Sequence, residues 1–245
     1  MKVKMMDSPQ ELGREAARLT AQAINEAIAE RGVARIVLST GASQFETLDE
    51  LRTLDVDWSK VEMFHLDEYV GITEAHLASF RKYLKERFTS KVSLQNAYFV
   101  DGEGEYEDKM KRLSEELRKA PIDIALIGIG ENAHIAFNDP PADFDNQQPY
   151  IVVNLDESCK RQQVREGWFP TVNDVPEFAI SMSVHQIMQS KKIISAVPHA
   201  VKAQAIKQTL ENDINPDIPA TILKTHSDWT LVLDRESAAG VEVAK

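Results

Sequence analysis

Residues 122–134 have the sequence Ile-Asp-Ile-Ala-Leu-Ile-Gly-Ile-Gly-Glu-Asn-Ala-His, an apolar run that passes directly into a glycine-rich loop. Such a run is typical of a strand that is buried on both faces of a parallel sheet. Shorter runs of the same kind lie at residues 35–39, 61–66, 150–155, 178–182, 192–197, 220–223 and 230–233. Amphipathic segments separate several of them, and this alternation predicts an α/β protein with a mostly parallel sheet covered by helices on both faces.

Helix signals occupy the segments between these runs. Ser8 precedes Pro9, and Glu11 follows three residues after Ser8, which is the pattern of a capped helix start. This helix is expected to extend to about Arg31. Further helices are expected from about residue 44, over 79–87, over 105–119 and over 200–210. No repeat, low-complexity tract or linker interrupts the order, so residues 1–245 are predicted to form a single domain.

Composition excludes several classes of function. The formal net charge of −11 argues against a nucleic-acid partner and against an anionic membrane surface, because both need clustered Lys and Arg. Cys159 is the sole cysteine, so neither an intrachain disulfide nor a structural zinc site built on thiolates is expected. The N-terminal residues lack the pattern of a signal peptide, and no stretch approaches the length of a membrane span. These features predict a cytoplasmic protein.

Ligands of α/β sheets bind beyond the carboxyl ends of the strands. The first candidate segment there is Ser-Thr-Gly-Ala-Ser-Gln at residues 39–44. Its small side chains allow a ligand to approach the backbone, and the following helix directs free N–H groups and its positive dipole end to the same place, which suits a phosphate. Taken alone, a plain strand-to-helix turn with Ser43 as the N-cap is the preferred interpretation.

The second segment places two adjacent carboxylates, Asp67 and Glu68, at the end of the predicted strand 61–66. Neighbouring side chains there point in different directions, so one carboxylate is free to face a ligand while the other has a structural partner. A carboxylate in a partly dry cleft can remove a proton from a carbon next to a carbonyl. The alternative is an N-capping Asp67 and a solvated Glu68.

The third segment, residues 127–141, contains His134 between Asn132 and Asp139 in a loop rich in glycine. Either neighbour can orient the imidazole, whose proton is readily exchanged near neutral pH. A catalytic His134 is therefore favoured over a structural one. The spacing Gly128-x-Gly130-x-x-Ala133 also matches a dinucleotide fingerprint, but that motif needs a helix at once, whereas residues 138–141, Asn-Asp-Pro-Pro, favour a loop.

These segments together resemble the glucosamine-6-phosphate deaminases. The sequences Phe-His-Leu-Asp-Glu-Tyr-Val-Gly at residues 64–71 and Gly-Ile-Gly-Glu-Asn-Ala-His-Ile-Ala-Phe-Asn-Asp-Pro at residues 128–140 are similar to two signature loops of that family. The turn at residues 39–43 resembles its phosphate loop, and residues 175–180 and the region of Lys202 fall where the family has similar stretches. The resemblance covers nearly the whole chain and implies a Rossmann-like sheet with a few added strands.

The resemblance also implies a reaction and its residues. An amino-sugar 6-phosphate such as glucosamine 6-phosphate would undergo aldose–ketose isomerisation with deamination, giving fructose 6-phosphate and ammonia without a cofactor. Asp67 would move the proton between the second and first carbons. His134, oriented by Asn132 and Asp139, would act in ring opening. The phosphate would be bound by Thr40, Gly41, Ala42, Ser43 and Lys202, with Arg165 or Arg161 in the place of the family's phosphate-binding arginine.

Three residues depart from the family pattern. Asn132 stands where some members have aspartate, Ala133 replaces a glycine, and Asp139 replaces a glutamate that is one methylene longer. Asp139 would reach His134 only if the loop closes in, and Ala133 requires a backbone that suits alanine. Lys202, Arg161 and Arg165 have the alternative interpretation of solvated charges on helices.

Two other functions stay open at this point. One is a 6-phosphogluconolactonase-like hydrolase, although those enzymes usually lack the Asp-Glu-Tyr and Ala-Phe-Asn elements present at residues 67–69 and 136–138. The other is a sugar-phosphate sensor without catalytic activity, which the three departures favour and an intact Asp67 and His134 argue against. No metal site is expected, because no histidine pair has ligand spacing. A homo-oligomer is an open alternative, since the sequence fixes no oligomeric state.

Overall fold

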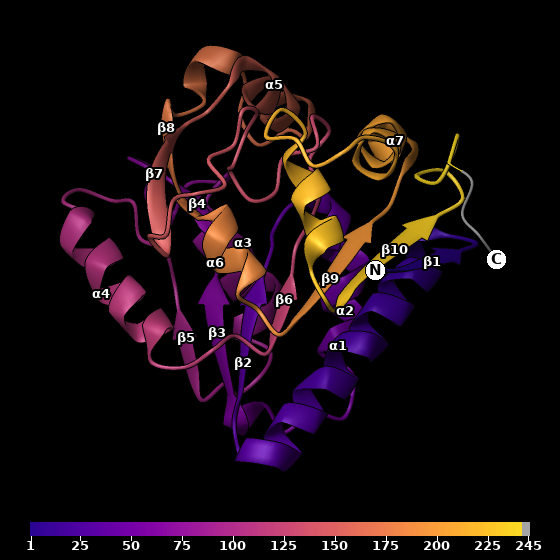
Figure 1. The fold of residues 1–245 in the computed structure, drawn as a ribbon. Coiled ribbons are helices and arrows are strands. Elements are labelled where there is room, and N and C mark those ends of the chain that lie inside the picture. Colours follow the sequence, from indigo (N-terminus) through magenta and orange to yellow (C-terminus); the bar gives the residue numbers. More distant parts are fainter. Residues whose placement is uncertain (242–245) are drawn as a thin grey trace.

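The computed structural model describes residues 1–241 and contains one large and one small sheet. The large sheet has seven parallel strands (Figure 1), in the order β1 (Lys2–Met6), β10 (Trp229–Asp234), β9 (Lys192–Val197), β6 (Ile124–Leu126), β2 (Ala34–Leu38), β3 (Val61–His65) and β5 (Asn96–Tyr98). The small sheet is antiparallel, in the order β4 (Asp67–Tyr69), β8 (Phe178–Met182) and β7 (Tyr150–Asn154). The predicted Rossmann-like parallel sheet with a few added strands is confirmed.

Helices cover both faces of the large sheet because successive strand residues point to opposite sides. Ile36 and Leu38 of β2 pack in a core with α1 (Pro9–Arg31), α2 (Phe45–Leu51) and α3 (Phe80–Leu84), whereas Val37 lies in the opposite core. That second core contains side chains of α4 (Glu107–Arg118), α6 (Val184–Met188) and α7 (Ala203–Glu211). Helix α5 (Glu157–Arg165) lies beyond the carboxyl ends of the strands (Figure 1).

The start and end of α1 are as the sequence predicts. Ser8 Oγ accepts a hydrogen bond from the Glu11 N–H at 3.2 Å, and Gly32 ends the helix with a left-handed φ of 80°. Gly13 is required where α1 crosses α2, because a Cβ at that position would come within 2.5 Å of Glu46 Cβ. None of the helices within residues 1–241 is long and apolar enough to cross a membrane.

Some elements differ from the sequence prediction. Residues 220–223, predicted as a strand, belong to a 3-10 helix over Pro219–Thr225, where Thr221 Oγ1 donates to the Ile218 carbonyl. A short buried apolar run has no periodicity that separates strand from helix, and Pro219 at the first position favours the helical start. The predicted helix over 79–87 is divided into α3 and a π-helical segment, Lys85–Thr89. Four further 3-10 turns lie at Ala42–Gln44, Trp58–Lys60, Val172–Asp174 and Ala200–Lys202.

Candidate active site

A cleft of about 550 Å³ opens at the carboxyl ends of the central strands. Its lining joins segments that are far apart in the sequence: the loop after β2, the start of β4, the loop after β6, helix α5 and the turn after β9. These are the places where the sequence predicted a site. The lining residues are Ser39, Thr40, Gly41, Ser43, Leu66, Asp67, Phe80, Gly128, Ile129, Gly130, His134, Ala136, Phe137, Gln162, Gln163, Glu166 and Lys202.

The loop after β2 is fixed in a conformation that suits anion binding. Gly41 has a φ of 96°, a region that favours glycine, and it precedes the 3-10 turn that leads into α2. The Gly41 carbonyl accepts hydrogen bonds from the Tyr83 hydroxyl at 2.9 Å and from the Gln44 N–H at 3.1 Å, which fixes the loop. Thr40, Gly41 and Ser43 line the cleft and Ala42 does not. Ser43 makes no side-chain cap, so the expected N-cap at Ser43 is wrong.

Asp67 and Glu68 are neighbours in β4 and therefore point to opposite faces. Asp67 faces the cleft and is 5% exposed. Glu68 is fully buried and accepts hydrogen bonds from the backbone N–H groups of Tyr69, Phe80 and Arg81 and from the Ser79 hydroxyl. The sequence left open which carboxylate has a structural partner, and the geometry assigns that role to Glu68.

The environment of Asp67 is suited to a general base. Burial raises the pKa of the Asp67 carboxyl well above its ordinary value of 3.8, and the charge of Glu68 raises it further. A carboxylate with a raised pKa binds a proton more strongly, which improves proton abstraction from a weak carbon acid. Asp67 also lies opposite Ser181 in the small sheet, and Ser181 Oγ accepts hydrogen bonds from the Phe137 N–H and the Asn138 side chain. These hydrogen bonds hold the histidine loop against β8, beside Asp67.

A tight turn at residues 130–134 orients His134. The Ala133 N–H donates to the Gly130 carbonyl at 3.0 Å, and the Gly130 N–H donates to the His134 carbonyl at 2.9 Å. No helix occurs within residues 127–149, so the helix that a dinucleotide fingerprint requires is missing there. Ala133 has a φ of 64°, in the left-handed region that favours glycine, so the expectation of a backbone that suits alanine is wrong.

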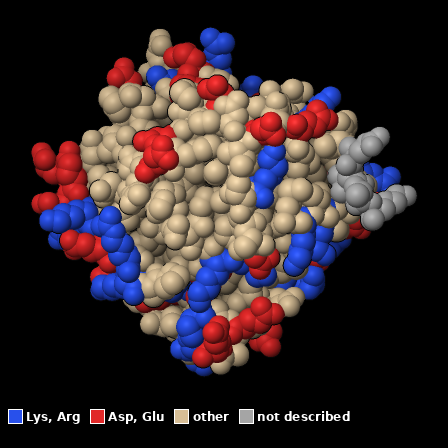
Figure 2. Space-filling view, in the orientation of Figure 1, with Lys and Arg blue, Asp and Glu red and all other residues tan. Residues whose placement is uncertain are grey.

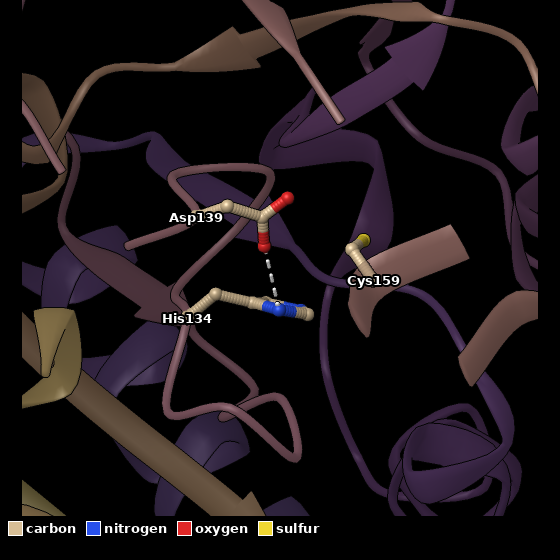
Figure 3. Close-up of side chains that lie close together, drawn as sticks. All are labelled: His134, Asp139 and Cys159. Atoms are coloured by element: carbon tan, nitrogen blue, oxygen red, sulfur yellow. Dashed lines mark ion pairs between the residues drawn. The ribbon is translucent and has the colours of Figure 1, made fainter. Parts of the chain in front are cut away.

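Two oxygens lie beside Nδ1 of His134. Asn132 Oδ1 is 2.6 Å away. Asp139 Oδ1 is 3.1 Å away (Figure 3). Asp139 therefore reaches the imidazole despite its shorter side chain. Burial acts to raise the pKa of Asp139, but the hydrogen bond and charge of His134 outweigh it and lower that pKa. Because both neighbours of Nδ1 are acceptors, Nδ1 carries the proton and Nε2 is left for a ligand.

Cys159 joins this group from α5, an arrangement that sequence spacing did not indicate. One donor atom each of His134, Asp139 and Cys159 lies within 4.8 Å of the others (Figure 3). Burial, followed by the charges of Asp139 and Asp156, raises the pKa of the thiol well above its ordinary value. A protonated, buried thiol is inert as a nucleophile, so Cys159 contributes packing beside Asp139.

Lys202 follows β9 and is 6% exposed, so the alternative interpretation of a solvated lysine is wrong. Among residues 1–241, its Nζ has neither a hydrogen-bond acceptor nor an ion-pair partner, although it lines the cleft. Burial lowers the pKa of Lys202. A buried cation without a partner is costly unless a ligand supplies the opposite charge, and this indicates an anion site.

Arg165 does not join the lining. It lies at the last position of α5 with its side chain 55% exposed, where it forms an ion pair with Glu131. Arg161 is also exposed on the same helix. Instead, α5 contributes Gln162, Gln163 and Glu166, none of which the sequence indicated. Gln163 accepts a hydrogen bond from the Tyr69 hydroxyl at 2.6 Å, which ties α5 to β4. Only the tertiary placement of α5 reveals which of its faces meets the cleft.

Charged side chains elsewhere are distributed without a single-sign area on the face in Figure 2. Lys and Arg lie beside Asp and Glu around its rim, and its middle is mostly uncharged. The formal net charge of the chain is −11, which repels anions. The buried Lys202 must therefore attract an anion against this overall field.

Comparisons with known proteins agree with this geometry. The sequence profile of the glucosamine-6-phosphate isomerases/6-phosphogluconolactonases matches residues 7–232. A glucosamine-6-phosphate deaminase of Oenococcus oeni is 32% identical, with 98% of each chain covered, and one of Listeria monocytogenes is 36% identical over 88% of this chain and 91% of its own.

Solved structures are also similar to this chain. A monomeric glucosamine-6-phosphate deaminase superposes with a TM-score of 0.88 at 31% identity, covering 97% of this chain and 99% of its own. A 6-phosphogluconolactonase of Shewanella baltica superposes with a TM-score of 0.78 at 20% identity, covering 96% of this chain and 97% of its own, a likeness that concerns the fold alone.

Proposed function

This chain belongs to the family of glucosamine-6-phosphate isomerases and 6-phosphogluconolactonases, and from that membership we propose that it converts glucosamine 6-phosphate to fructose 6-phosphate and ammonia. One observation carries the choice within the family: buried Asp67, with its raised pKa, shares one cleft with His134 and the unpaired Lys202. That cleft combines a base for a carbon-bound proton, a group for ring opening and a cation for the phosphate.

The proposed reaction begins with ring opening. His134 Nε2 takes the proton of the hydroxyl on the first carbon and returns it to the ring oxygen, while Asn132 and Asp139 hold Nδ1. Asp67 then removes the proton from the second carbon while the ammonium form of the amino group gives a proton to the aldehyde oxygen, which yields an enolamine. Asp67 delivers its proton to the first carbon. The second carbon is left as an iminium, to which water adds before ammonia leaves. Atoms balance as substrate plus water giving fructose 6-phosphate plus ammonia.

The deciding experiment mixes purified protein with glucosamine 6-phosphate and follows ammonia and fructose 6-phosphate. The panel includes galactosamine 6-phosphate, N-acetylglucosamine 6-phosphate and 6-phosphogluconolactone. Both products from glucosamine 6-phosphate support the deaminase. Turnover of the lactone alone would favour the hydrolase, and tight binding of the amino sugar without turnover would favour the sensor.

Lys202, the proposed phosphate-binding cation, can be tested by substitution. Lys202→Gln should raise the KM for glucosamine 6-phosphate by roughly 10–100-fold, the loss expected for a charge-assisted hydrogen bond. The kcat should change much less, because the phosphate is remote from the reacting carbons. The change also removes a buried unpaired charge, so the melting temperature should not fall. Steady-state kinetics and thermal melts check this.

The matched control for this prediction is Lys207→Gln, at an exposed position on α7. It should leave KM unchanged. An unaltered KM in Lys202→Gln would remove Lys202 from the proposed phosphate site. The single-domain organisation of residues 1–245, the cytoplasmic location and the open alternative of a homo-oligomer stay predictions.

A further inference from the structure

Resting on the proposed function, we propose that Glu166 is a specificity-determining residue that weakens the binding of a phosphate dianion at the Lys202 end of the cleft. Within the described residues 1–241, Lys202 is the one lysine or arginine that lines the cleft, and Glu166 and Asp67 are the two carboxylates that line it. A site for a phosphorylated sugar thus contains a fixed negative charge that its ligand must face.

Glu166 is held in place rather than free to swing away. Its Oε1 accepts a hydrogen bond from Gln162 Nε2 at 2.8 Å, and its Oε2 accepts one from Trp168 Nε1 at 3.0 Å. The residue caps the end of α5, and Gly167, with a φ of 83°, turns the chain immediately afterwards. Two neutral donors therefore fix the carboxylate in the wall of the cleft without neutralising it.

Arg165, the last residue of α5, and Glu166, the residue that caps it, place opposite charges on opposite sides of that wall. Arg165 points outward to Glu131, and Glu166 points into the cleft. No ion pair joins Glu166 to Lys202 within 4.0 Å, yet Glu166 is the carboxylate that most favours the charged form of Lys202 against the effect of burial on its pKa. The field of Glu166 thus compensates part of the lysine's charge.

This arrangement has a consequence for selection among anions. A phosphate monoester carries close to two negative charges near neutral pH, so Lys202 attracts it and Glu166 repels it. Inorganic phosphate, which lacks a sugar, then binds weakly. A sugar phosphate overcomes the repulsion only through contacts of its sugar with the part of the cleft that holds Asp67 and His134. The repulsion by Glu166 therefore increases the preference for phosphates that carry a fitting sugar.

The test is Glu166→Gln, which removes the charge and keeps the side-chain volume. Inorganic phosphate, titrated calorimetrically against the whole protein, should bind the variant roughly five- to tenfold more tightly, as expected for the loss of one nearby unit charge. The KM for glucosamine 6-phosphate should fall by a similar factor, with kcat within about twofold. Unchanged or weaker phosphate binding would overturn the proposal.

Two further variants separate charge from position. Trp168→Phe removes one of the hydrogen bonds that hold the carboxylate and leaves the charge; equally tighter phosphate binding in this variant would show that position, not charge, is responsible. Glu157→Gln neutralises an exposed residue at the other end of α5 and should leave phosphate binding unchanged.

The binding of inorganic phosphate can be measured without turnover, so this inference and the proposed function can fail separately. If Glu166→Gln binds phosphate more tightly but the unchanged protein shows no deamination, the proposed function is refuted and this inference stands.

Discussion

Replacing Asp67 with Asn should reduce kcat for glucosamine 6-phosphate by roughly 10²–10⁴-fold, the range for loss of a positioned general base. Asn has nearly the same shape but cannot accept the proton from the second carbon. The phosphate loop and Lys202 lie on other segments, so the variant should still bind substrate. Binding by calorimetry and turnover by ammonia release measure the two quantities separately. Full activity in Asp67→Asn would contradict the assignment of Asp67 as the base.

The same change should stabilise the folded protein at pH 8. Burial, with the charge of Glu68, raises the pKa of Asp67 well above 3.8 in the folded state. A carboxyl whose pKa is raised by folding lowers stability as the pH increases from its unfolded-state pKa through its folded-state pKa, and the full penalty applies above both values. Asn carries no such penalty, so the melting temperature should rise by about 2–4 °C for each kcal/mol recovered.

The adjacent carboxylate, Glu68, provides a control in which an amide substitution should change the melting temperature in the opposite direction. Glu68→Gln would replace a carboxylate that accepts five hydrogen bonds with an amide. One of the five comes from the buried Arg81 guanidinium, 3.4 Å from Glu68, which would be left with less compensation. Burial also raises the pKa of Glu68 against the effect of these hydrogen bonds, so removal of the charge recovers some stability. The loss of the charge-assisted hydrogen bonds and of the Arg81 partner should outweigh that gain and lower the melting temperature. Two neighbouring Asp/Glu-to-amide changes thus shift stability in opposite directions, which a general effect of lost negative charge does not produce.

The pH dependence follows from the same raised pKa. Asp67 must be deprotonated to act as a base, so kcat/KM should increase with pH as the carboxyl loses its proton. Because the folded-state pKa lies well above 3.8, this limb should occur at a higher pH than for an ordinary aspartate. An acidic limb near pH 4 would show that another group, or an unperturbed carboxyl, limits the reaction.

The sequence predicted the parts of this molecule whose signals are local. A capping residue, a proline and a left-handed glycine mark α1 at its two ends, and Asp67 and His134 follow strands whose apolar runs are strong. In a parallel sheet the carboxyl ends of strands meet at one edge, so local patterns sufficed to place these side chains in one cleft.

Features that depend on tertiary contacts were not predictable in the same way. Strands β4 and β5 have three residues each, and β1 is a short edge strand at the N-terminus, so none produces a periodic pattern. Arg165 ends α5 and Glu166 follows it, and only the packing of that helix decides that the acid enters the cleft. The choice of Arg165 followed its charge and its place in the resemblance to the family, and neither indicates which way a helix faces.

Gly130→Ala should reduce kcat/KM by about 10²-fold or more, although it adds a single methyl group. A Cβ at Gly130 would come within 2.2 Å of His134 Cε1 and 2.3 Å of Nε2, which shows that the imidazole lies directly against the glycine. Both contacts involve the ring itself, so the ring must move away from Asn132 and Asp139. A displacement of about 1 Å in a catalytic group can cost this much in rate.

The comparison variant is Gly128→Ala in the same loop, where a Cβ would meet only Gln44 Nε2 at 3.4 Å, so its loss of kcat/KM should be much smaller. A double-mutant cycle then isolates the cause. If Gly130→Ala acts by displacing the imidazole, it should add almost no further loss in a His134→Asn background, because the displaced group is already absent. A full additional 10²-fold loss in that background would instead mean that Gly130 acts on the backbone of the loop. Retention of more than a third of wild-type kcat/KM in the single variant Gly130→Ala would show that ring opening does not depend on the observed position of His134.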